Sequence, residues 1–407
     1  MTIEERLSIL KEIADEMEKR EKEYIEGFAR DIGVSVKVGK AEMDLAVNYL
    51  RTMEEEVRYV IGKKPYGVVG GILPYDASPI MFARIAGSGL LAGNDVYVSF
   101  SSLTPTSRDI TYDIVKNITD KIKITDKIKI NVSMDNRKFG DFCTYNDDIR
   151  VFFISGGDDV GKLFESRKEY FDKIIFAGPS GMPICVVNED VDVANVASFV
   201  AFRAFLNGGQ YCTTIKRVLV HERIYEDFME YLLREVDKIK VGDPMDPDTD
   251  YGPIKAERTI RLFERLLNSM KGWVLTGGKV EEGGYIHPTV VELEYIPDLE
   301  AFGPFLGVMK FKDIESAIDY SLSTRFRHII YLFGSIPEDL LAKVREGYGM
   351  VYHNEFVRYL PVRMPYGGKL SAGWVLERKN GGFIKKDGPI VYSEELCHCL
   401  LYTSPSP

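Results

Sequence analysis

Cysteine and long apolar runs are both scarce in this chain. Five of its 407 residues are cysteines, an odd number without the paired spacing of a disulfide framework. No apolar run approaches the roughly 18 residues that a membrane-spanning helix needs. The first ten residues, MTIEERLSIL, are charged from the fourth position, which excludes the apolar stretch of a secretory signal. We therefore expect a reduced, cytoplasmic protein without a membrane partner.

Basic residues are outnumbered by acidic ones. The chain has 52 Lys and Arg against 62 Asp and Glu, which gives a net charge of −10 and a pI of about 5.3. Nucleic-acid binding requires a basic surface, so no nucleic-acid partner is expected.

The end of the sequence contains a Cys397-His398-Cys399 triplet. It has no evident fourth ligand, so no metal site is expected. We interpret residues 396–407 as an atypical tail, either disordered or a remnant of cloning.

Apolar runs and amphipathic segments alternate along the chain. The chain has 407 residues and 45% hydrophobic content, which makes it too long to fold around a single hydrophobic core of ordinary size. Two domains are therefore expected. The first thirty residues have helical periodicity, with a Thr2/Glu5 capping box and a stop at Gly33. The alternation of strands and helices predicts an open α/β sheet. We expect further helices near 40–59, 79–91, 190–205 and 225–239, and strands near 66–73, 95–100, 151–154, 218–221, 289–293 and 329–333.

A tandem hexapeptide occupies residues 120–131 and reads DKIKIT followed by DKIKIN. Alternating Lys and Ile is typical of a strand with one solvated face. We interpret the repeat as a local duplication at a sheet edge.

One cysteine lies in a setting that suits nucleophilic chemistry. Cys212 follows Asn207-Gly208-Gly209-Gln210-Tyr211 and precedes a predicted strand. A cysteine after a Gly-Gly turn is sterically open, and its thiolate is the attacking species. From composition alone, a buried and inert cysteine remains the alternative.

The sequence around Cys212 resembles the NAD(P)-dependent aldehyde dehydrogenases, and the resemblance extends over about residues 5 to 380. FLNGGQYCTTIKRVLVHERIYEDF resembles the family's nucleophile region, and VGDPMDPDTDYGPI resembles the loop that follows it. Glu300-Ala301-Phe302-Gly303-Pro304 resembles the E-x-F-G-P motif. MPYGGKLSAGW at 364–374 resembles the M-P-F-G-G-x-K-x-S-G motif with one residue missing. YGVVGGILPYD and LLAGNDVYV resemble the family's first strands.

The resemblance implies a two-domain architecture. A Rossmann-type cofactor domain would span 1–183 and a second α/β catalytic domain 184–366. Residues 367–395 would return to the interdomain and oligomerisation region. The oligomerisation hairpin near 57–66 is shorter than the family's, so a homodimer is expected more than a tetramer.

The resemblance also implies a mechanism and assigns roles to single residues. Cys212 would attack an aldehyde, hydride would pass to NAD or NADP, and water or a thiol would release the acyl group. The backbone N–H of Cys212 would supply half of the oxyanion hole. The expected cofactor contacts are Pro74, Tyr75, Ser99, Gly156, Gly157, Val160, Glu300 and Phe302.

Several positions depart from the family pattern. Asp76 occupies the place of the oxyanion-binding Asn, and Ala177 (or Gly178 with a one-residue shift) occupies that of the general-base Glu. Ser99 replaces the Lys of the K-P-S motif, and Phe326-Arg327-His328 replaces Y-G-L. An ionised Asp76 would repel an oxyanion, and losing one such donor typically costs about 10²–10³ in rate.

Three functions are compatible with these residues. The first is an aldehyde dehydrogenase that acts on a small-molecule aldehyde with NAD or NADP. The second is a catalytically degenerate paralogue that serves as a nucleotide-binding or assembly subunit. The third is a thiolate-based reductase of an acyl phosphate or thioester. The choice of aldehyde, of NAD or NADP and of water or thiol as acceptor stays open at this point.

Overall fold

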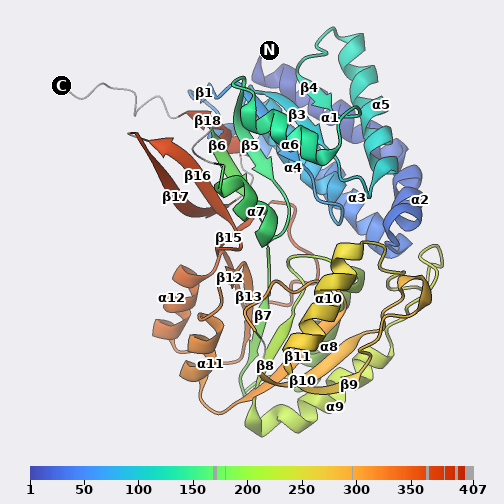
Figure 1. Cartoon of the computed structure of the whole chain (residues 1–407), viewed down its shortest axis with the longest axis vertical. Coiled ribbons are helices and arrows are strands. Elements are labelled where there is room, and N and C mark those ends of the chain that lie inside the picture. Colours follow the sequence, from blue (N-terminus) through green and yellow to red (C-terminus); the bar gives the residue numbers. More distant parts are fainter. Residues whose placement is uncertain are drawn as a thin grey trace.

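The computed structural model describes residues 1–167, 172–178, 180–295, 297–363, 366–379, 381–389 and 393–398. Two large sheets organise these residues, one of nine strands and one of seven, with a two-stranded sheet beside them. Figure 1 shows the nine-stranded sheet and its helices above the seven-stranded sheet. This is the α/β architecture that the alternation of apolar runs predicted.

The nine-stranded sheet has a parallel centre and an antiparallel flank. Its strand order is β12-β15-β17-β16-β6-β5-β2-β3-β4, and the neighbours from β6 to β4 are parallel. The strands are β2 (Val68–Ile72), β3 (Asp95–Ser99), β4 (Ile128–Ile130), β5 (Ile149–Ile154), β6 (Ile174–Ala177), β12 (Phe326–Arg327), β15 (Gly367–Leu370), β16 (Trp374–Lys379) and β17 (Gly382–Pro389).

The helices of the N-terminal half begin and end where the local chemistry indicates. Thr2 and Glu5 form the expected capping box, and Gly33 ends the second helix at φ 75°. The single helix expected over the first thirty residues is two helices, which meet at Arg20. The helices are α1 (Ile3–Lys19), α2 (Glu21–Ile32), α3 (Val36–Arg51), η1 (Met53–Tyr59), α4 (Ser78–Leu91), α5 (Pro105–Lys121), α6 (Asn136–Tyr145) and α7 (Asp158–Glu165).

The seven-stranded sheet is parallel except at one edge. Its order is β14-β13-β7-β8-β11-β10-β9, and β9 pairs antiparallel with β10. The strands are β7 (Ile184–Val187), β8 (Arg217–His221), β9 (Lys271–Thr276), β10 (Thr289–Tyr295), β11 (Phe305–Phe311), β13 (Ile329–Phe333) and β14 (Met350–His353). The helices of this half are α8 (Val193–Phe205), η3 (Leu206–Gly209), η4 (Glu222–Ile224), α9 (Tyr225–Asp237), α10 (Glu257–Ser269), η5 (Glu282–Gly284), α11 (Ile314–Ser321) and α12 (Glu338–Gly347).

The chain returns to the first sheet after residue 366. Strands β15 to β17 extend the nine-stranded sheet beyond β6, as a return to the interdomain region requires. β12 also joins this sheet, although it lies inside the segment predicted as the catalytic domain. The domain boundaries near 183 and 366 therefore stay predictions.

Two connecting segments have structures that the sequence analysis did not predict. Residues 53–59 form the 3-10 helix η1, and only β1 (Lys64–Pro65) follows, so there is no hairpin at 57–66. The tail begins in ordered structure, since η6 (Ser393–Leu396) leads into β18 (Cys397–His398), which pairs with β1. The burial of Leu396 and Cys397 explains this order. The remainder of the tail, 399–407, lies outside the described residues.

The hexapeptide repeat adopts two conformations. The second copy contains β4, the edge strand that the alternation predicted, but the first copy ends α5 and turns at Lys123, with φ 59°. In the described part of the chain, no helix is long and apolar enough to cross a bilayer.

Candidate active site

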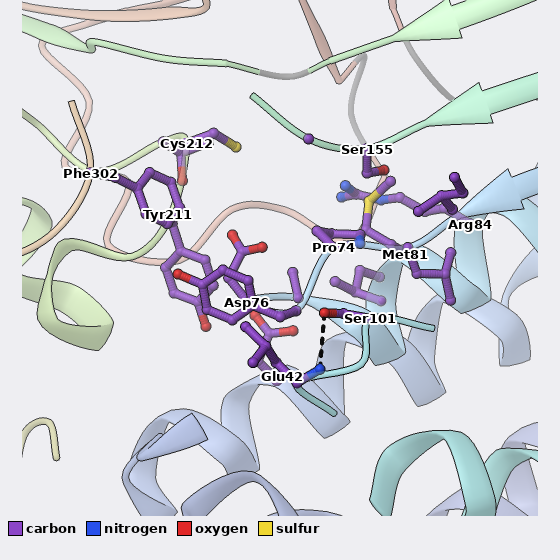
Figure 2. A pocket seen from close by; sticks show the side chains of 18 of the residues that line it. Glu42, Pro74, Asp76, Met81, Arg84, Ser101, Ser155, Tyr211, Cys212 and Phe302 are labelled. Atoms are coloured by element: carbon purple, nitrogen blue, oxygen red, sulfur yellow. Dashed lines mark hydrogen bonds between the residues drawn. The ribbon is translucent and has the colours of Figure 1, made fainter. Parts of the chain in front are cut away.

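A cavity of about 1050 Å³ opens where the two large sheets approach each other. Its wall is made by the ends of β2 and β5, by α3 and α4, and by the segments around Cys212 and Glu300. The carboxyl ends of parallel strands are the usual place for a ligand in an open α/β sheet. Figure 2 shows Cys212, Tyr211 and Phe302 on one side, Arg84 on the other, and Asp76 and Glu42 below.

A left-handed turn places Cys212 in this wall. Asn207, Gly208 and Gly209 have φ of 52°, 59° and 68° in succession, a conformation that L side chains rarely adopt. A Cβ on Gly209 would lie 2.0 Å from the carbonyl oxygen of Gly303 and 2.6 Å from Lys216 Nζ. The Gly-Gly pair therefore allows the segment before Cys212 to pack directly against the E-x-F-G-P segment.

The Cys212 thiol is buried and makes one side-chain hydrogen bond. Its exposed fraction is 8%, and its Sγ lies 2.8 Å from the Tyr366 hydroxyl. The Cys212 carbonyl oxygen lies 3.2 Å from Nδ1 of His328. Burial, followed by the charge of Asp76, raises the pKa of this thiol to about 12, while Tyr366 and Arg84 oppose the rise. Cys212 is therefore a protonated thiol at rest.

Arg84 carries its charge into the cavity from an otherwise apolar helix. Its exposed fraction is 4%, and its guanidinium carbon lies 4.4 Å from the centroid of the Tyr366 ring. Within the described ranges, no ion pair joins Arg84 to a carboxylate at 4.0 Å or less. Arg84 thus places a buried positive charge on the cavity wall, where it also lowers the pKa of Glu42.

Two carboxyl groups on the cavity wall hold protons near neutral pH. Burial is the main cause that raises the pKa of Asp76 to about 7, and the charge of Glu300 adds to it. Burial also raises the pKa of Glu42 to about 7, with a contribution from Asp76 and an opposing hydrogen bond from Tyr211. One oxygen of Glu42, Oε2, is buried without a partner in the described part of the chain.

The glycine turn after β5 meets the Glu300 segment. A Cβ on Gly157, the residue before α7, would lie 2.0 Å from the Arg258 guanidinium and 2.6 Å from Glu300 Oε2. Arg258 donates to Asp159 at 2.8 Å and to Glu300 at 3.0 Å. Asp158 is paired with Arg325 and Lys162. The aspartates at this helix start are thus neutralised. The glycine backbone beside the helix N-terminus would accept a cofactor diphosphate once the Arg258 side chain moves away from Gly157.

Most of the residues predicted from the sequence share this cavity. The wall includes Pro74, Tyr75, Asp76, Gly156, Gly157, Val160, Cys212, Glu300 and Phe302. Tyr75 also binds the Cys212 segment, because its hydroxyl donates to Gln210 at 3.2 Å.

Two predicted positions lie outside the wall. Ser99 is buried, donates to Asn136 at 2.7 Å and accepts from Asn131 at 2.9 Å, so its hydroxyl is used within the sheet. Ala177 is buried in β6 opposite Trp374 and places no carboxylate in the cavity. Phe326-Arg327-His328, which replaces the family's Y-G-L sequence, brings the His328 ring into contact with the carbonyl oxygen of Cys212.

The wall residues that sequence reasoning missed include four with titratable side chains close to the site, namely Glu42, Arg84, Arg258 and Tyr366. Two of them had a signal. Arg84 is the one charge in the apolar run IMFARIAGSGLL, and Tyr366 stands where the family motif has Phe. Glu42 and Arg258 lie on polar amphipathic helices, where nothing in the pattern separates them from solvated neighbours.

Comparison with known proteins agrees with this geometry. The profile of the "Aldehyde dehydrogenase family" matches residues 1–383. A 3-sulfolactaldehyde dehydrogenase of Priestia aryabhattai is 27% identical, over 96% of this chain and 84% of the relative. A lactaldehyde dehydrogenase of Methanococcus vannielii is 26% identical, over 96% of this chain and 86% of the relative.

Solved structures share the fold. A succinate-semialdehyde dehydrogenase from Burkholderia pseudomallei superposes with a TM-score of 0.85 at 23% identity, over 97% of this chain and 84% of that one. Glyceraldehyde-3-phosphate dehydrogenase from Methanocaldococcus jannaschii, complexed with NADP, has a TM-score of 0.84 at 22% identity, over 98% and 89%. The chain therefore belongs to the aldehyde dehydrogenase family and is an oxidoreductase that converts an aldehyde to an acid or acyl product with NAD or NADP.

Proposed function

We propose that Cys212 is the nucleophile of this reaction. The observation that carries the proposal is the buried Cys212 thiol in one cavity with the Gly156-Gly157 turn and Glu300. The sulfur would add to the aldehyde carbon, the carbonyl oxygen would become an alkoxide, and the Cys212 backbone N–H would face it. Loss of hydride then leaves a thioester on Cys212.

The cofactor NAD or NADP accepts the hydride when it is bound. We propose that the glycine turn at Gly156 and Gly157, with Val160 behind it, holds the diphosphate at the start of α7. Glu300 would accept hydrogen bonds from ribose hydroxyls, and Phe302 would border the nicotinamide ring. Arg258 contacts Glu300 in this structure, so ribose binding would have to displace it.

The proposed substrate is a short aldehyde with an anionic group. Arg84 supports this choice, because a buried guanidinium without a carboxylate partner gains most from an anion in the cavity. The relative named for 3-sulfolactaldehyde acts on an aldehyde that carries a sulfonate, and lactaldehyde is a 2-hydroxyaldehyde of the same length. We propose a 2-hydroxyaldehyde of this size whose anionic end faces Arg84.

Glu42 is the proposed proton acceptor. A group with a pKa near the working pH is the most effective general base, and the pKa of Glu42 is about 7. Asp76 couples electrostatically to Cys212, and its negative charge opposes loss of the thiol proton. Glu42 is the candidate to activate the water that releases the acyl group, in place of the carboxylate missing at Ala177.

An absorbance assay for reduced cofactor tests this function directly. We expect turnover with 3-sulfolactaldehyde and lactaldehyde in the presence of NAD or NADP, and none after Cys212→Ala. Arg84→Met should lower kcat/KM for the sulfonate at least roughly tenfold relative to lactaldehyde, because the uncharged substrate does not need the cation. A wild-type protein that reduces neither cofactor with any aldehyde would instead favour the degenerate paralogue.

We also propose that the chain forms a homodimer in a reducing compartment of the cell. β9 is a sheet edge with large apolar side chains in solvent, since Trp273, Val274 and Leu275 are 61%, 51% and 42% exposed. Exposed apolar edges invite pairing with another chain. The four described cysteines are free and buried, which supports a reducing location.

A further inference from the structure

The hydroxyl of Tyr366 contacts the sulfur on which the reaction depends. The distance from Tyr366 Oη to Cys212 Sγ is 2.8 Å, and each residue is 8% exposed. The family motif has Phe at this place, which supplies a ring without a hydroxyl. The contact is therefore not explained by packing of the aromatic ring alone.

Tyr366 can only be the donor once the thiol is ionised. A thiolate has no proton, whereas burial and the neighbouring Cys212 raise the pKa of Tyr366 well above its ordinary value. The phenol therefore keeps its proton over the whole working range. A hydrogen bond to a charged acceptor is roughly twice as strong as one between neutral groups.

Two neighbours hold the Tyr366 ring in place. Arg84 lies over one face at 4.4 Å from the centroid, and His328 meets the ring edge-on at 5.3 Å between centroids. His328 also contacts the carbonyl oxygen of Cys212 at 3.2 Å. The hydroxyl is thus held against the sulfur by residues that also contact the Cys212 segment.

We propose that Tyr366 is a catalytic residue that donates a hydrogen bond first to the Cys212 thiolate and then to the alkoxide formed from the aldehyde. This inference rests on the proposed role of Cys212 as nucleophile. Tyr366 thus supplies a side-chain donor when the alkoxide forms. In the family pattern this donor is an Asn, and Asp76 occupies its position in this chain. An ionised Asp76 cannot donate, but the Tyr366 phenol can at any working pH.

The step balances with groups already described. The Cys212 proton passes to solvent water in the cavity, and the sulfur electron pair forms the S–C bond. The π electrons of the aldehyde carbonyl move to its oxygen. This oxygen is two bonds from the sulfur, so the Tyr366 hydroxyl would reach it as well. The Tyr366 hydrogen bond follows the negative charge from sulfur to oxygen. When the C=O bond reforms, hydride leaves to NAD(P)⁺ and Tyr366 is still protonated.

Several titratable and charged groups face the sulfur or its carbonyl and must be held constant in any pH experiment. They come from the segment before α4, from α4, from β13, from the segment before β13 and from the segment before β15: Asp76, Arg84, Tyr331, His328 and Tyr366. Tyr366→Phe changes only one of them and keeps the ring between Arg84 and His328.

Alkylation of Cys212 tests the first half of the proposal without cofactor or aldehyde. Iodoacetamide labelling of the Cys212 peptide would be followed by mass spectrometry from pH 6 to 10. We expect Tyr366→Phe to move the labelling profile about one pH unit upward, which is roughly a tenfold slower rate at a given pH. Tyr295→Phe, at a 53% exposed tyrosine of β10 outside the cavity wall, should leave the profile unchanged. An identical profile for Tyr366→Phe and wild type overturns this half of the proposal.

The pre-steady-state burst of reduced cofactor tests the second half. Tyr366→Phe should slow the burst by about 10²-fold, the usual cost of losing one oxyanion donor. In an Asp76→Asn background the same change should cost less than tenfold, because Asn supplies a second donor. Equal losses in the two backgrounds, or no loss in either, would overturn the proposal. If wild type shows no burst, the function proposed for Cys212 fails, while the labelling profile still decides whether Tyr366 donates to the sulfur.

Discussion

The carboxyl group of Asp76 faces two opposing requirements. Below pH 7 it holds a proton and can donate to an alkoxide, because its pKa is raised to about 7. The proposed nucleophile requires higher pH, because the pKa of Cys212 is raised and its thiolate becomes more abundant only as pH rises. The wild-type protein should therefore have a narrow pH optimum.

Asp76→Asn should remove this conflict. The amide is a permanent donor, and the charge that raises the thiol pKa is gone. We expect at least a roughly tenfold faster burst of reduced cofactor, equivalent to about 1.4 kcal/mol in barrier. The alkaline limb of the pH profile, where the wild-type Asp76 is ionised and cannot donate, should also disappear. A burst rate and pH profile identical to wild type would place Asp76 outside the reaction.

Glu42 should matter for release of the acyl group rather than for its formation. Glu42→Gln removes the proposed base while it keeps shape and hydrogen bonding. We expect kcat to fall at least roughly tenfold with the burst intact, because general-base catalysis typically contributes 10²–10⁴-fold. Glu54→Gln, at an exposed residue of η1, is the control. If Glu42→Gln abolished the burst as well as lowering kcat, the assignment of Glu42 to acyl release would be contradicted.

At the scale of elements, the Asn-Gly-Gly turn is the part of the site most sensitive to backbone change. Gly209→Ala must place a methyl group 2.0 Å from the Gly303 carbonyl oxygen, so the two segments must separate. Gly62 is a matched control, because its φ of 71° is similar and nothing lies within 4 Å of its Cβ position.

Chemical denaturation should separate the two glycines. Gly62→Ala should cost only the strain of a left-handed residue, about 1–2 kcal/mol in the free energy of unfolding. Gly209→Ala should cost clearly more and should lower the burst rate. Equal costs would mean that the two packed segments tolerate separation.

The edge strand β9 carries the prediction for assembly. Val274→Lys places a charge on the exposed edge, and such charges prevent pairing between sheets. We expect wild type to sediment as a dimer at micromolar concentration and Val274→Lys to sediment as a monomer. Tyr231→Lys, at a 37% exposed residue of α9, serves as the control for added charge. A monomeric wild type would contradict the proposed homodimer.

Elements with a strong local pattern were predictable, and those decided by contacts were not. β13 has the predicted bounds because Ile329–Phe333 is a run of buried apolar residues. The two copies of the hexapeptide differ because the first follows a helix and the second can pair with β3. The Cys397–His398 strand depends on its partner Lys64–Pro65, more than 300 residues earlier, so local composition indicated the wrong outcome.

At the scale of the whole molecule, the family motifs predicted which segments form the site but not how they pair. Cys212, Asp76 and Glu300 were each located from a local motif. Glu42 and Tyr366 join them only through the packing of α3 and of the segment before β15. Ser99 does not line the cavity, because its side chain serves the hydrogen-bond network of Asn131 and Asn136.

Cofactor binding should stabilise the folded chain as a unit. At one hundred times the dissociation constant, NAD or NADP should raise the free energy of unfolding by about 2.7 kcal/mol. Gly157→Ala should abolish most of that gain, because a methyl group would collide with Arg258 and Glu300. Thermal unfolding with and without cofactor measures both effects, with Gly62→Ala as the control. A full cofactor response in Gly157→Ala would place the diphosphate elsewhere.

The bond between Cys212 and Tyr366 also has a consequence for the newborn protein. The two residues are 154 positions apart, and a ribosome adds about 5–20 residues per second. A nascent chain thus carries its reactive sulfur for roughly 8–30 s before Tyr366, its hydrogen-bond partner, has been synthesised. During translation the thiol lacks both that partner and the wall segment around it. The site is completed only after Tyr366 has been added, which leaves the unfinished enzyme more exposed to oxidants than the folded one.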